Sequence, residues 1–129
     1  MTLQQTIHDV WKSDSTLKKR IPPEFLTYNY SPFERLPRAT FLVKNQNVVA
    51  RTNQGTAAEK AAVEFIVFET SCANVLDDLN QIIELYDGKT FDLVTDKKIV
   101  AFALVESNVT HDNNHWIADI VFDAKIFHL

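Results

Sequence analysis

Two histidines four positions apart form the pattern that most resembles a metal site. His111 and His115 enclose Asp112 in the segment THDNNHW. Two imidazoles at this spacing suit zinc when they share one face of a helix. Here they enclose an Asp-Asn-Asn run, which is typical of a turn between two strands. We therefore expect an exposed hairpin tip and predict that the protein requires no metal and no other cofactor.

The single cysteine is the other candidate for chemistry. Cys72 lies just before a predicted helix, and a thiol at a helix N-terminus can become reactive. Catalysis also needs a base within hydrogen-bond reach of the thiol, and no motif in the sequence supplies one. The only glycines, Gly55 and Gly88, are too few and too far apart for a phosphate-binding loop. We predict an inert cysteine and a protein that is not an enzyme.

Length and composition indicate one globular domain covering residues 1–129, because 46% of the residues are hydrophobic and 23% are charged. One cysteine excludes an internal disulfide and favours a reducing compartment. The N-terminal MTLQQTIHDVWK lacks the pattern of a secretory signal, so we expect a cytoplasmic location. The net charge of −4 argues against a nucleic-acid partner or an anionic membrane.

Two helices are predicted from apolar residues at helical spacing. The first covers about 2–12, with Thr2 as N-cap and Gln5 completing a capping box. The second covers about 74–87 and ends before Gly88. Its apolar stripe is expected to be Val75, Leu76, Leu79, Ile82, Ile83 and Tyr86. Its carboxylates, Asp77, Asp78 and Glu84, are expected on a solvated face.

Strands are predicted at 38–44, 48–52, 59–70, 90–94, 98–106 and 115–127, from alternating or continuous apolar residues. Short connections between consecutive strands imply an antiparallel sheet, so the fold class is α+β with two helices packed on one face. Residues 98–106 are apolar on both faces, and a strand of this kind needs a cover on each side. The second cover is either another subunit or the segment 21–37, an aromatic arm with four prolines.

The predicted core includes Leu76, Leu79, Ile83, Phe65, Phe102, Ile120 and Phe122. Outside it, the basic residues Arg38 and Arg51 belong to a sparse positive set with Arg35 and Lys44. They are either ordinary surface charges or part of a docking surface, since arginine is enriched at interfaces.

A polar loop is expected at 53–58. Loops on a rigid scaffold often carry binding residues. We therefore name Arg38, Arg51, Asn53, Gln54 and Gly55 as candidates for contact with a partner.

The layout resembles the small tail-completion proteins of long-tailed bacteriophages, the tail terminator or head–tail joining group. The resemblance runs over nearly the whole chain. It is carried by LPRATFLV, RTNQGTAAEKAAVEFIVF, NQIIELYDGKTFDL and KIVAFALVESNVTHDNNHWIADIVFDAKI, which follow a short N-terminal helix. The arm at 21–37 is richer in aromatic residues than that group leads us to expect.

This resemblance implies a structural protein of the virion tail, present in the host cytoplasm during assembly. It implies an oligomeric ring, commonly a hexamer, that caps the tail tube. The partners would be the tail tube protein and the head-completion or connector proteins. A ring forms when a heterologous interface closes on itself.

Two other classes remain open. The chain could be a small-molecule-binding protein or enzyme of dimeric α+β type, with its pocket between sheet and helices. It could also be a regulatory binding module. A ring of several copies in size-exclusion chromatography would favour the tail protein, and a compact dimer would favour the small-molecule class.

Overall fold

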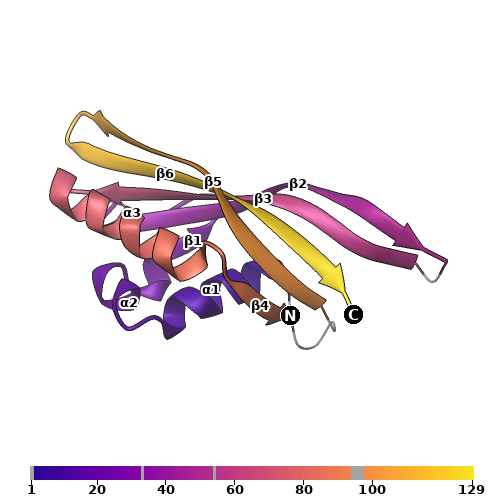
Figure 1. Ribbon diagram of the computed structural model, residues 1–129. Coiled ribbons are helices and arrows are strands. Elements are labelled where there is room, and N and C mark those ends of the chain that lie inside the picture. Colours follow the sequence, from indigo (N-terminus) through magenta and orange to yellow (C-terminus); the bar gives the residue numbers. More distant parts are fainter. Residues whose placement is uncertain (1, 33, 54, 94–97) are drawn as a thin grey trace.

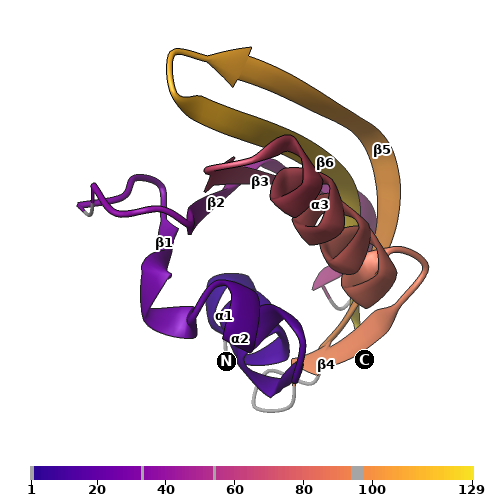
Figure 2. The same cartoon turned by 90° about the vertical axis from the view of Figure 1, so that its left-hand side faces the viewer.

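The computed structural model describes residues 2–32, 34–53, 55–93 and 98–129. The fold is α+β, as predicted: a strongly curled sheet of six strands holds the helices in its concave side (Figures 1 and 2). The strand order is β1-β2-β3-β6-β5-β4. All neighbouring pairs are antiparallel except β1 and β2, which are parallel.

The elements follow one another as α1 (Leu3–Ser13), α2 (Leu17–Arg20), the 3-10 turn η1 (Pro23–Phe25), β1 (Leu26–Tyr28), β2 (Arg38–Thr52), β3 (Gly55–Glu69), α3 (Cys72–Tyr86), β4 (Thr90–Leu93), β5 (Lys98–Asp112) and β6 (His115–His128). Helix α1 begins with the predicted capping box, in which Thr2 and Gln5 bond reciprocally. Gly88 follows the end of α3 with φ of +70°, a conformation that glycine adopts without steric cost. No helix in the described part of the chain has the length and apolar character of a membrane span.

One buried cluster joins the helices to the concave face of the sheet. Phe65 lies at its centre, with ring contacts to Trp11, Phe41, Tyr86 and Phe122. Two hydrogen bonds fix the helices around these rings. Tyr86 donates its hydroxyl to the carbonyl of Ile7 at 2.7 Å, and the Trp11 indole donates to the carbonyl of Ile21 at 3.0 Å. Both bonds satisfy polar atoms of rings that are fully buried.

Two predictions about α3 are wrong. Leu76 does not enter the core and is 43% exposed, whereas Val75 beside it is fully buried. Asp78 does not lie on a solvated face and has no exposed surface. It occupies the stripe between Val75 and Ile82, three and four positions away, which is the spacing of one helix face.

The first predicted hairpin is longer than expected. The Asn45–Asn47 segment is not a turn between two strands, because β2 runs without interruption from Arg38 to Thr52. A register shift against β3 between Lys44 and Asn47 takes its place, with φ of +55° at Asn45. The expected loop at 53–58 is also shorter, since β3 already begins at Gly55. The run of polar residues therefore marks a β-bulge and not a turn. Residues of this kind are found in both structures.

The arm at 21–37 lies on its own domain along its first half. Leu26 is buried, and β1 pairs with Ala39, Thr40 and Phe41 of β2. The ring of Tyr28 meets that of Phe41 edge to face, with centroids 5.3 Å apart. This segment extends the sheet at its edge. The described part of the arm therefore does not cover the second apolar face of the strand predicted at 98–106.

Candidate assembly surfaces

Two long hairpins leave the body of the protein at opposite ends (Figure 1). The first consists of β2, which ends at Thr52, and β3, which begins at Gly55, and the second joins β5 to β6 through Asn113 and Asn114. Cross-strand pairs place Val48 level with Val100 across the sheet, and Val109 level with Ala39. The outer parts of the hairpins are thus offset by roughly 30 Å along the strand direction.

The structure brings only part of the predicted partner set together. Arg51, Asn53 and Gly55 are exposed and adjoin the tip of the first hairpin, and Gln54 lies outside the described residues. Arg38 begins β2, at the other end of the strand. Its guanidinium lies 4.4 Å from the ring centroid of Phe68, a cation–π contact on the convex face of the sheet.

The second hairpin carries the two histidines at its tip, as predicted. His111 pairs with Trp116 and Asp112 with His115, so the imidazoles project to opposite faces of the ribbon. The ring of His111 stacks on that of Trp116 with centroids 4.4 Å apart. No group of three or more metal-ligating side chains occurs in the described ranges.

Each hairpin exposes one unpaired strand edge. We define the basic edge as residues 44–51 of β2 and the acidic edge as residues 105–112 of β5. Strand β1 covers β2 only as far as Phe41, and β4 covers β5 only as far as Ala101. The neighbouring backbone of Gly88 and Lys89 bonds to Phe102. Beyond these contacts, no described strand pairs with the outer side of either edge.

The two edges differ in charge and share exposed valines. The charged residues of the basic edge are Lys44 and Arg51, and those of the acidic edge are Glu106 and Asp112. Exposed apolar side chains on the edges are Val48 (39%), Val49 (56%) and Val105 (54%). Open strand edges can template pairing with another chain, and proteins usually cover or disrupt them.

The convex face of the sheet carries half-buried apolar residues around a carboxylate pair. The apolar residues are Leu42, Ile66, Phe68, Ile117 and Val121. The pair is Glu64 and Asp119, which are diagonal neighbours across β3 and β6, because Glu64 pairs with Val121 and Asp119 with Ile66. Burial, together with the hydrogen bond and the charge of Glu64, raises the pKa of Asp119 to about 6.

Lys44 completes this group on the convex face. Its ammonium donates to Glu64 at 2.5 Å. The hydrogen bond from Asp119 and the one from Lys44 lower the pKa of Glu64. The group is therefore two adjacent carboxyl groups and one ammonium on a half-buried surface, with the ammonium bonded to Glu64.

A second carboxylate pair lies on the concave side. Arg20 of α2 donates to Asp78 at 2.5 Å, and Asp78 interacts with the buried Glu69 of β3. Burial raises the pKa of Glu69 to about 8, and the hydrogen bond and charge of Asp78 add to the rise. These residues hold α2, α3 and β3 together. In the sequence, the sign of this cluster is Asp78, a carboxylate within the apolar stripe of the predicted helix.

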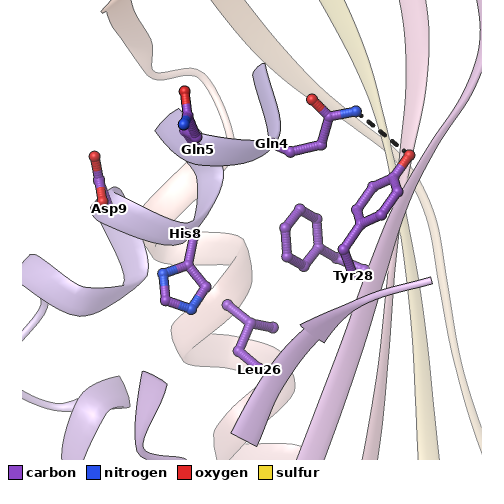
Figure 3. Close-up of a pocket in the computed structure, with 7 residues that line it drawn as sticks. Gln4, Gln5, His8, Asp9, Leu26 and Tyr28 are labelled. Atoms are coloured by element: carbon purple, nitrogen blue, oxygen red, sulfur yellow. Dashed lines mark hydrogen bonds between the residues drawn. The ribbon is translucent and has the colours of Figure 1, made fainter. Parts of the chain in front are cut away.

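A groove of about 610 Å³ runs between α1, β1 and β2 (Figure 3). Leu26 and Phe41 form its apolar floor, with Gln4, Gln5, His8, Asp9 and Tyr28 around them. Two of its polar groups are already engaged. His8 lies 2.8 Å from the carbonyl of Pro23, and Gln4 donates to the Tyr28 hydroxyl at 3.5 Å. The groove is the place where a small ligand between sheet and helices would bind.

Cys72 is the first residue of α3 and is half-buried. Ser71 caps this helix by accepting a hydrogen bond from the amide of Asn74 at 3.1 Å. In the described chain, the thiol has no ion pair or hydrogen bond to an acid or a histidine, so no base is held ready to activate it.

No protein-family model matches the sequence, and a search of curated proteins finds no significant relative. Among solved structures, the chain is similar to a protein in the structure titled "Virion of native gene transfer agent (GTA) particle". The TM-score is 0.72 and the sequence identity is 14%, and the alignment covers 97% of this chain and 94% of that chain. At this identity the likeness establishes a shared fold, and the two chains share it from end to end.

Proposed function

We propose that this protein is a structural, non-enzymatic subunit of a phage-like virion and that residues 1–129 act as one domain. The observation that carries the proposal is the end-to-end likeness to a protein of a gene transfer agent virion, at a TM-score of 0.72. Because the alignment covers 94% of that chain, the likeness extends well beyond a common supersecondary motif. A fold can serve several functions, so the surfaces must supply further support.

Within the virion, we infer that the chain acts as a tail-completion protein at the end of the tail tube. Its copies would form a ring, commonly a hexamer, whose partners are the tail tube protein and the head-completion or connector proteins. The resemblance in layout supports this role. Long hairpins and a half-buried convex face also suit a subunit that contacts neighbours on several sides.

The tip of the first hairpin is the proposed contact with the tail tube. Arg51, Asn53 and Gly55 belong to this tip, and Gln54, the fourth residue of the proposed contact, lies outside the described residues. Its described residues project beyond the core, where they can bind a partner without disturbing the fold. Arg38 would serve a different contact on the convex face, because it lies at the opposite end of β2.

A shortened hairpin tests this role. Ala50 and Ala58 are cross-strand partners, so residues 51–57 can be replaced by Asn-Gly, which forms a tight two-residue turn. We expect a folded protein with an unchanged melting temperature but overlong or headless tails in electron micrographs. The matched control is Asn114→Gly at the tip of the other hairpin, which should give normal particles. Normal joined virions that contain the shortened protein would contradict the proposed contact.

The groove of about 610 Å³ is the observation that favours the alternative, a dimeric small-molecule-binding protein. Its apolar floor could bury part of a ligand. Native mass spectrometry separates the two functions, because the alternative predicts a compact dimer and a co-purifying small molecule. The tail-protein role predicts a ring of more than two copies, or a monomer that assembles on the tube.

A further inference from the structure

We propose that neighbouring copies of this chain join by placing the acidic edge of one copy (residues 105–112) against the groove between α1, β1 and β2 of the next. The inference deepens the proposed ring and rests on it. The occupant of the groove is then a second copy of the same chain and not a small molecule. The contact joins two unlike surfaces, which is the kind of repeated contact that closes into a ring.

The groove offers apolar surface that the single chain leaves uncovered. Leu26 and Phe41 form its floor, and Tyr28 beside them stays 42% exposed (Figure 3). Tyr30, just after β1, is 69% exposed. A volume of about 610 Å³ lies in the range of pockets that bury most of a small ligand, so it also admits a few side chains of a partner.

The acidic edge presents an apolar side chain to fill the groove. The register of β5 against β6 shifts between Leu104 and Glu106, so Val105 has no cross-strand partner and is 54% exposed. Bulges of this kind redirect a side chain. Strand β4 pairs with β5 only as far as Ala101, so no described strand covers the edge. An open edge is normally protected, and a neighbouring copy would protect this one.

The groove and the acidic edge lie level with each other along the strands. Cross-strand pairs run from Tyr28 of β1 across β2, β3 and β6 to Ser107 of β5, and in the same way from Leu26 to Val109. Rotation about an axis along the middle strands, β3 and β6, keeps this level, so the two surfaces of neighbouring copies can meet. The basic edge lies roughly 30 Å farther along the strands and does not take part.

The two surfaces also lie on opposite sides of the molecule. Strand β1 ends the sheet on one side, and the outer part of β5, which extends past β4, borders it on the other (Figure 2). One copy therefore cannot place its own edge in its own groove. Each copy can instead offer its edge to one neighbour and its groove to the other, as a cyclic assembly requires.

Charge favours the same contact. Arg35 and Arg38 lie near the start of β2 with one acid, Glu34, and Arg38 donates to the carbonyl of Arg35 at 3.2 Å. The acidic edge contains Glu106 and Asp112 and no lysine or arginine. Cross-strand pairs place Arg38 two residues from the level of Asp112. Opposite charges steer association, whereas two acidic edges would repel each other.

Cross-linking of mixed copies tests the contact directly. In a Cys72→Ser background, one population carries Gln4→Cys at the groove and the other carries Ser107→Cys on the acidic edge, and the probe is a short bis-maleimide. The inference predicts covalent dimers in the mixture and none in either population alone. The matched control, Val49→Cys on the basic edge mixed with Ser107→Cys, should give none.

The outcomes separate this inference from the proposed function. Dimers from Gln4→Cys alone would show groove against groove and overturn the inference. Dimers from the control mixture without those of the proposed pair would show that the two open edges meet, and would also overturn it. A ring without the mixed cross-link, or a chain that stays monomeric up to its solubility limit, contradicts the groove contact. The virion role is judged separately, from the composition of purified particles.

A charge at the exposed valine adds a second measurement. Val105→Asp should raise the dissociation constant of self-association at least about tenfold, because a carboxylate would have to leave water for the apolar floor of the groove. Val49→Asp changes a valine of similar exposure on the basic edge, 56% against 54%, and should leave self-association unchanged. Both variants should keep the wild-type melting temperature, since both side chains are exposed. Equal effects of the two substitutions on self-association would contradict the assigned contact.

Discussion

The two faces of the sheet differ in how completely their side chains are buried. On the concave face, helices α1 and α3 bury aromatic rings completely, and the polar atoms of Trp11 and Tyr86 find backbone partners. On the convex face, Ile66, Phe68 and Val121 stay half-buried, with no described helix above them (Figure 2). The chain thus completes one core by itself, and the other face and the strand edges are available to partners.

The largest expected effect comes from two phenylalanines of β3 that point to opposite faces. Phe65→Ala should lower the free energy of unfolding by about 3–5 kcal/mol, because it removes the ring at the centre of the buried cluster. Phe68→Ala should cost about 1 kcal/mol, since it removes a half-buried ring and its contact with Arg38. Urea unfolding measures both values. Equal losses would show that the isolated chain depends on both faces alike.

The carboxylate pair of the concave face should give the next largest effect. The pKa of Glu69 is raised from 4.5 to about 8, so its proton is retained in the folded state where the unfolded chain has lost it. This contribution to stability is complete below pH 4.5 and is lost as the pH rises through about 8. Glu69→Gln keeps a donor for Asp78 and should raise the free energy of unfolding at pH 8 by roughly 1–3 kcal/mol.

Chemical denaturation over a series of pH values measures this effect. The control is Glu84→Gln on the exposed side of α3, which should follow the wild-type profile. If the Glu69→Gln profile ran parallel to that of the wild type, the assigned proton on Glu69 would be wrong.

The carboxylate pair of the convex face should give the smallest effect on stability. Stability depends on pH in the same direction at Asp119. Its pKa is raised from 3.8 to about 6, so its contribution to the free energy of unfolding falls as the pH rises through this window. Because the pair is half-exposed and bonded to Lys44, Asp119→Asn should change the free energy of unfolding by less than about 1 kcal/mol. A change in the free energy of unfolding as large as that of Glu69→Gln would show that the convex face forms a second buried core.

The pattern of the sequence was sufficient for the main elements. Apolar spacing located α1 and α3, and alternation located β3 and β6. It was insufficient where a local signal has two structural outcomes. The run Asn45–Asn47 marks a bulge and not a turn, and the decision depends on the pairing of β2 with β3. Strand β1 was missed because three residues carry no periodicity of their own.

The candidate surfaces were less predictable than the elements. The turn of the first hairpin falls within the expected polar loop at 53–58, although most of that loop is strand. Arg38 was grouped with this turn but lies at the far end of a 15-residue strand. The open edges could not be inferred at all, because an edge is a property of strand order and of the length of the neighbouring strand. Asp78 could have been recognised from its place in the helical stripe.

The most direct test of the central claim is to locate the protein in purified particles. A gold-labelled antibody against this chain, viewed by electron microscopy, should mark one site on each particle, at the junction of head and tail. The same particles should contain the intact chain by mass spectrometry. Particles that lack the chain, or label spread along the whole tail, would contradict its assignment as a tail-completion protein.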